Sequence, residues 1–74
     1  MPLSMMGLGT KAVVTELSGR IELRKFLCAL GFVAGKQVEV VQYTLGNNMI
    51  VAIGGARLAL DKNLAHCIQI IPQD

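Results

Sequence analysis

The hydrophobic positions change their spacing along the chain, and this change marks the first two elements. The segment Lys11–Leu17 is rich in Val and Thr, which are stiff at χ1 and fit a pleated sheet, so it predicts a strand. Further on, the apolar residues fall at i, i+3, i+4 and i+7, the spacing of one helix face, at Leu23, Phe26, Leu27 and Leu30. Gly31 follows, where a helix end favours a residue without a Cβ atom. A helix from Ile21 to Leu30, with this face in the core, is therefore predicted.

Four further β-rich segments follow, at residues 37–43, 49–53, 57–60 and 67–71. Gly and Asn residues at 45–48, and the Gly54-Gly55 pair, tolerate the positive φ of tight turns between them. Asp61 can cap a single helical turn through Asn63, and Pro72 is expected to end the last strand. The fold class predicted is mainly β, with five short strands and one short α-helix between the first and second. A tightly curled barrel is expected, because open strand edges invite aggregation.

The composition fits one small domain over residues 1–74, with 53% hydrophobic and 16% charged residues. Aromatic residues make up only 4%, which argues against base stacking and so against a nucleic-acid partner. The apolar runs fall well short of the roughly 18 residues that a membrane span needs. Residues 1–6 lack the basic and apolar blocks of a secretory signal, so a cytoplasmic protein without membrane insertion is expected. Among the methionines, Met5 and Met6 are expected to plug the open end of the barrel, and Met49 to pack inside it.

Catalytic chemistry finds no support in the residues. The segment Gly31–Gln37 has one residue too few between its glycines for a phosphate-binding loop, and it joins a helix to a strand rather than the reverse. The carboxylates are scattered, and the single histidine, His66, has no evident nucleophile or orienting acid. We therefore predict a protein that is not an enzyme and holds no cofactor.

Metal binding rests on three soft ligands, Cys28, His66 and Cys67. Neighbours on a strand point to opposite faces, so His66 and Cys67 would not converge on one ion, and structural sites usually present four ligands. The residues therefore predict no metal site within the chain. A labile site for Fe²⁺ or another transition metal, shared between two subunits of a homodimer, stays open.

Basic residues lie on the other side of the predicted helix, where Arg24 and Lys25 accompany Cys28. They constitute either an ordinary solvated surface or the rim of a docking surface for an acidic partner. Cys28 is expected to be exposed on the same side.

The chain resembles the FeoA family, small cytosolic accessory proteins of bacterial ferrous-iron uptake. The resemblance is carried by Leu3-Ser4, Gly9, Ala12-Val13-Val14, Arg24-Lys25-Phe26-Leu27, Leu30-Gly31-Phe32-Val33-Ala34-Gly35, Val38-Glu39-Val40-Val41, Leu45-Gly46, Leu58-Ala59-Leu60, Ala65 and Ile68. Three departures stand out: Ala34 replaces a usual turn proline, Thr44 to Asn48 lacks prolines, and Asp61 replaces a basic residue. The resemblance implies an SH3-like barrel with an inserted helix. It also implies action on FeoB, a membrane transporter whose cytosolic domain hydrolyses GTP.

Two functions follow as hypotheses. In the first, the chain docks on the cytosolic part of the FeoB-like transporter and modulates its GTPase or transport activity, with Arg24, Lys25, Cys28 and Arg57 as contacts. In the second, it is a metal-responsive regulatory module that binds a transition metal through Cys28, His66 or Cys67, across a homodimer. A small nucleic-acid-binding barrel is a third reading, against which the low aromatic content argues.

Overall fold

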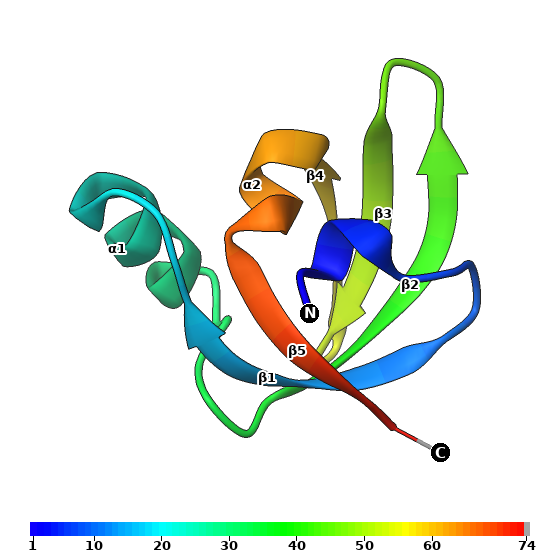
Figure 1. Cartoon of the computed structure of the whole chain (residues 1–74). Helices are drawn as coiled ribbons and strands as arrows, with labels where there is room; N and C mark the ends of the chain where they lie inside the picture. The colour runs from blue at the N-terminus through cyan, green and yellow to red at the C-terminus, as the bar shows by residue number, and fades with distance from the viewer. Residues whose placement is uncertain (74) are drawn as a thin grey trace.

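Five antiparallel strands form one curled sheet in the order β4-β3-β2-β1-β5 (Figure 1). The computed structural model describes residues 1–73. The strands are β1 Lys11–Leu17, β2 Gln37–Thr44, β3 Asn48–Ile53, β4 Ala56–Asp61 and β5 Ile68–Gln73, and the helices are the 3-10 turn η1 Leu3–Met5, α1 Ile21–Ala29 and α2 Lys62–His66. The predicted strands and the helix between β1 and β2 are confirmed. None of the helices in the described chain is both long and apolar enough to traverse a lipid bilayer.

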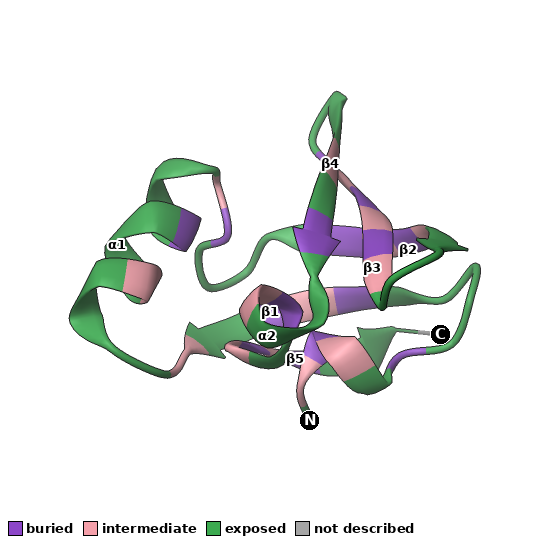
Figure 2. Ribbon diagram, turned by 90° about the horizontal axis from the view of Figure 1, so that it is seen from above, coloured by how far each residue is buried: buried purple, intermediate pink, exposed green. Residues whose placement is uncertain are grey.

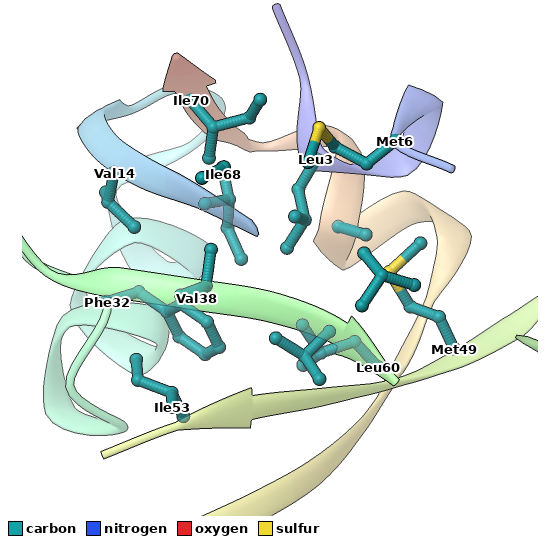
Figure 3. Packing of buried hydrophobic residues seen from close by; sticks show 14 of the residues in the cluster. Leu3, Met6, Val14, Phe32, Val38, Met49, Ile53, Leu60, Ile68 and Ile70 are labelled. Carbon is teal, nitrogen blue, oxygen red and sulfur yellow. The ribbon is translucent and has the colours of Figure 1, made fainter. Parts of the chain in front are cut away.

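The core lies inside the curl of the sheet and is entirely apolar within the described residues (Figure 3). Alternate residues of β3 point into it, as a pleated strand with one buried face requires. The buried cluster comprises Leu3, Met6, Ala12, Val14, Leu27, Phe32, Val38, Val40, Met49, Val51, Ile53, Leu60, Ala65, Ile68 and Ile70. Met49 and Met6 are buried as expected, whereas Met5 is 69% exposed and does not plug the barrel.

Two β-bulges interrupt the alternation and keep polar side chains out of this core. In β1 the pairing with β5 shifts between Val14 and Glu16, so that Leu17, not Glu16, faces inward with Ile68. In β2 the pairing with β3 shifts between Val40 and Gln42, and Gln42 stays exposed. Each bulge thus places a polar residue outside at a position where strict alternation would bury it.

Helix α1 contributes only one buried side chain, which corrects the predicted apolar face. Leu27 is fully buried, but Phe26 is 52% exposed and Leu30 is 36% exposed. Figure 2 shows α1 standing beside the sheet with most of its surface open to solvent. The helix therefore inserts one residue fully into the barrel end, while Leu23 is half-buried and Phe26 and Leu30 stay exposed.

The second helix is longer than predicted, and this changes the element in which His66 lies. The Asp61 carboxylate caps α2 by accepting a hydrogen bond from the Leu64 amide at 2.8 Å, as expected, but the helix continues past Asn63 to His66. His66 is thus a helix residue and not the start of a strand, and Cys67 follows as the helix C-cap. The last strand begins at Ile68 instead of Cys67.

The last strand also contains Pro72, which was expected to end it. Pro72 pairs with Ala12 of β1. Ile70, two residues before it, exchanges hydrogen bonds with Met1 on the outer edge of β5, at 2.7 and 3.0 Å. Residues two apart direct their backbone groups to the same side, so the amide that Pro72 lacks would point away from β1. The proline therefore interrupts no hydrogen bond of the sheet.

Candidate functional site

A groove of about 380 Å³ runs along α1, and one regularly spaced face of the helix forms its wall. That wall comprises Ile21, Arg24, Lys25 and Cys28, at i, i+3, i+4 and i+7. The facing wall comes from the end of β1 and from the connector that leads to β2, through Glu16, Leu17, Phe32, Val33 and Ala34. The groove therefore lies between the helix and the barrel.

The end of α1 fixes the helix against the barrel. The Phe32 amide donates to the Leu27 carbonyl oxygen at 3.1 Å, and the Gly31 amide donates to the Cys28 carbonyl oxygen at 3.0 Å. Gly31 has φ 105°, and this pair of bonds around a residue of positive φ is a Schellman motif. Because Leu27 and Phe32 are both fully buried, the motif anchors the last turn of α1 to the core.

The groove combines an apolar lining with positive charge. Ile21 and Val33 are both about half exposed, so the groove presents two apolar side chains to solvent. Arg24 and Lys25 are exposed on the helix wall, and Glu16 is the one acidic residue of the lining. A partner segment with apolar side chains and a carboxylate would match this surface in both shape and charge.

Three of the four predicted contact residues meet in this groove. Arg24, Lys25 and Cys28 line it together, and Cys28 is exposed as expected. Arg57 does not line it, because it lies in β4, opposite Ala52 of β3. Sequence reasoning missed Ile21 and Val33, although the spacing of Ile21 with Arg24 and Cys28 could have placed it on the same helix face.

A second groove of about 380 Å³ offers a weaker case for recognition. It is lined by Lys11, Lys36 and Glu39, together with backbone around Gly35 and Gly54. Charges of both signs lie beside apolar atoms there, and large apolar side chains are few. The groove along α1 is the better candidate for protein docking.

The predicted metal ligands are not assembled within the chain. Cys28 lies on α1, whereas His66 ends α2, where its Nδ1 atom is 3.2 Å from the Ser4 hydroxyl oxygen. The Cys67 thiol donates to the Asn63 carbonyl oxygen at 3.5 Å, and both cysteines are free. Across residues 1–73, no three His, Cys, Asp or Glu side chains come together as a metal site would require.

Comparison with known proteins connects the chain to one family. The FeoA domain model matches residues 1–72. A crystal structure of an iron uptake regulatory protein, FeoA, is 30% identical, with a TM-score of 0.89 over 99% of this chain and 96% of that one. Among curated proteins, none matches this sequence.

Two further solved structures bear on the fold. A zinc complex of FeoA from Stenotrophomonas maltophilia is 30% identical, with a TM-score of 0.85 over 96% of this chain and 89% of that one. It is described as a prokaryotic SH3 domain protein and a candidate activating factor of bacterial ferrous iron transport. A manganese-dependent transcriptional repressor has a TM-score of 0.90 over 99% of this chain and 36% of that one, at 18% identity, and so shares the fold alone. The curled sheet described above is thus an SH3-like fold.

Proposed function

Because this chain belongs to the FeoA domain family, we propose that it is a non-enzymatic accessory protein of bacterial ferrous-iron uptake that works in the cytosol. Its partner is a membrane ferrous-iron transporter with a cytosolic GTPase domain, of the FeoB type. By docking there, it modulates GTP hydrolysis or transport. The descriptions of two solved relatives, as an iron uptake regulatory protein and as a candidate transport activating factor, support a regulatory role.

The groove along α1 is the observation that carries this proposal. It presents exposed apolar side chains beside two unburied cations, Arg24 and Lys25, which is a composition suited to protein contact. The exposed flank of α1, with Phe26 and Leu30, adds apolar area next to it. A partner helix or extended segment could place apolar residues in the groove and carboxylates against the cations.

The charged and the apolar residues of the groove contribute to binding in different ways. Arg24 and Lys25 accelerate the encounter with an acidic segment and select for it, because exposed charges affect the association rate and specificity more than the final affinity. Ile21 and Val33 contribute apolar area that the partner removes from water. Cys28 has a small side chain, which leaves the centre of the helix wall open for a partner side chain.

The test measures binding to the soluble GTPase domain of the ferrous-iron transporter from the same organism. Calorimetry is run with GDP, with a non-hydrolysable GTP analogue, and with and without Fe²⁺, and GTP hydrolysis is followed in parallel. We expect binding in at least one nucleotide state. The double variant Arg24→Glu/Lys25→Glu should weaken it at least about tenfold, since like charges would then oppose the acidic segment.

The matched control is Lys36→Glu/Lys62→Glu, which changes the net charge by the same amount, because both lysines are exposed and lie outside the groove. It should bind as the parent chain does. Equal loss in this control and in the groove variant would show a general effect of net charge and overturn the groove as the contact surface. Absence of binding in every nucleotide state would overturn docking on the GTPase domain.

A second candidate function is a metal-responsive regulatory module, favoured by the zinc complex of the Stenotrophomonas maltophilia relative. In this chain Cys28 lies on α1 while His66 and Cys67 lie at the end of α2, so two copies would have to combine their ligands. Such a site would make the oligomeric state depend on the metal. Because no single copy brings these ligands together, we rank this function below docking.

A further inference from the structure

The two edges of the sheet differ in whether their outward backbone groups have partners. On the outer edge of β5, the Ile70 amide donates to the Met1 carbonyl oxygen at 2.7 Å, and the Met1 amino group donates to the Ile70 carbonyl oxygen at 3.0 Å. Pro2 forms an isolated antiparallel bridge with Gln69, and Pro72 carries no amide further along the same edge. This edge is covered or chemically blocked, which is how proteins prevent strand addition.

The opposite edge, along β4, is open. The β3–β4 hairpin has the two-residue turn Gly54-Gly55, with Gly54 at φ 59°, as a type II′ turn requires. In such a hairpin the flanking pair, Ile53 and Ala56, is hydrogen-bonded, and bonding then alternates along the strand. Arg57, Ala59 and Asp61 therefore direct their backbone groups away from β3.

These outward groups lack backbone partners in the described part of the chain. No turn, loop or cap hydrogen bond among residues 1–73 reaches the amide or carbonyl of Arg57 or Ala59, or the amide of Asp61. The side chains of the same three residues are exposed. Figure 2 shows the β3–β4 hairpin projecting from the sheet, with its tip clear of both helices. The edge carries no proline and no bulge to discourage a further strand.

We propose that this edge is a self-association site, at which β4 of a second copy adds as an antiparallel strand around a two-fold axis. With the axis at Ala59, Arg57 of each copy stands opposite the partner's Asp61, and the two Ala59 residues face each other. Charge complementarity selects this register: a shift by two residues would place Arg57 opposite the partner's Ala59 and leave Asp61 unpaired. The same surface patch therefore recognises itself, as a two-fold interface requires.

Asp61 can keep its hydrogen bond to α2 and still take part in the proposed interface. One oxygen of the Asp61 carboxylate caps α2 through the Leu64 amide, and a carboxylate can accept further bonds on its second oxygen. The Asp61 carbonyl belongs to the start of α2, so the outer pairs of the interface use the Asp61 amide and the partner's Arg57 carbonyl. The methyl group of Ala59 is small enough to let the two backbones approach at the centre.

The association should be weak and sensitive to salt. The strand is six residues long, and its exposed face carries two charged residues and one alanine but no large apolar side chain. Exposed ion pairs contribute little and are screened by salt, so the dimer should appear only as protein concentration rises. Its site is separate from the groove along α1, and it leaves that groove free.

Sedimentation velocity over a concentration series, at low and high salt, tests the proposal. The chain should shift from monomer toward dimer as concentration rises. Arg57→Glu opposes two carboxylates at each outer pair and should weaken dimerisation at least about tenfold. Adding Asp61→Asn to that variant removes the repulsion while keeping a capping side chain, and should restore part of the association.

Backbone pairing is tested independently by Ala59→Pro, which removes an amide that points away from β3 and so spares the β3–β4 ladder. Circular dichroism verifies that it folds, and amide exchange of Ala59 and Asp61 in the parent chain should slow with concentration. Arg24→Glu, which changes the net charge by the same amount as Arg57→Glu, is the matched control and should dimerise normally, which separates this surface from the docking groove. Monomer at every concentration, or dimerisation unaffected by Arg57→Glu and Ala59→Pro, would overturn the proposal.

Discussion

Leu27 and Phe32 are joined twice, once through the backbone and once through the core. The Phe32 amide donates to the Leu27 carbonyl oxygen at 3.1 Å, and both side chains are fully buried in the same apolar cluster. A hydrophobic contact across the end of a helix commonly accompanies this backbone motif. In this chain, that pair is what holds an otherwise exposed helix against the barrel, and with it one wall of the candidate groove.

Truncation of the two neighbouring helix leucines should have very different effects. Leu27→Ala should lower the free energy of unfolding by about 2–5 kcal/mol, since it leaves a cavity in a packed core. Leu30→Ala should cost about 1 kcal/mol, because the Leu30 side chain is already 36% exposed. Urea unfolding followed by circular dichroism measures both. Equal losses would mean that both leucines are buried and that α1 lies closer to the barrel than described.

The glycine that ends α1 should not tolerate a side chain. Gly31→Ala forces a residue with a Cβ atom into φ 105° and should destabilise the fold by about 1–2 kcal/mol. The added Cβ would lie 3.7 Å from the Ile53 side chain, an ordinary contact, so the cost comes from the backbone. Gly55→Ala is the control, since Gly55 has no positive φ and open space around its Cβ position. Thermal unfolding should separate the two variants clearly.

The cap of α2 should depend on a side-chain oxygen and not on charge. Asp61→Ala should reduce stability by about 0.5–2 kcal/mol, because the Leu64 amide loses its acceptor. Asp61→Asn keeps an acceptor oxygen and should stay close to the parent chain. Chemical unfolding of both variants checks this. Similar losses in the two would show that the negative charge, and not the hydrogen bond, stabilises the helix.

A single copy of the chain should not bind Fe²⁺ at micromolar concentration. Cys28 lies on a different element from His66 and Cys67, and His66 is engaged with Ser4. Anaerobic calorimetry with Fe²⁺ and with Zn²⁺, at a concentration where the protein is monomeric, provides the measurement. Binding that disappears in His66→Ala or Cys67→Ser would contradict this expectation and favour the metal-responsive module.

The strands were predictable because their signal is local. Short runs of β-branched residues set β1 and β3 to within about a residue, and Gly54-Gly55 set the turn after β3. The face of α1 was not predictable in the same way. Periodicity shows that Phe26 and Leu30 share a side with Leu27, but not whether a neighbouring element is there to cover that side.

The sequence indicated only part of the groove. Arg24, Lys25 and Cys28 stood out as charged or reactive residues on one side of a helix, whereas Ile21 and Val33 carry no charged or reactive group that would have singled them out. Only the folded chain shows that Ile21 and Val33 stay half exposed beside the cations. The prediction that Pro72 ends the last strand was wrong for a related reason. A proline interrupts a strand only where its missing amide would have bonded to a neighbouring strand, and the sequence does not show which way that amide points.

The bulges in β1 and β2 mark positions where a strand could lose one residue without turning its other side chains over. Deleting Thr15 would remove the extra residue of β1, and regular alternation would then leave Glu16 outside and Leu17 inside, as they are now. Deleting Val41 would likewise leave Gln42 outside in β2. In β3, whose alternation is regular, deleting one interior residue would instead turn every residue beyond it to the opposite face. Evolutionary change in strand length should therefore be accepted at the two bulges before it is accepted in β3.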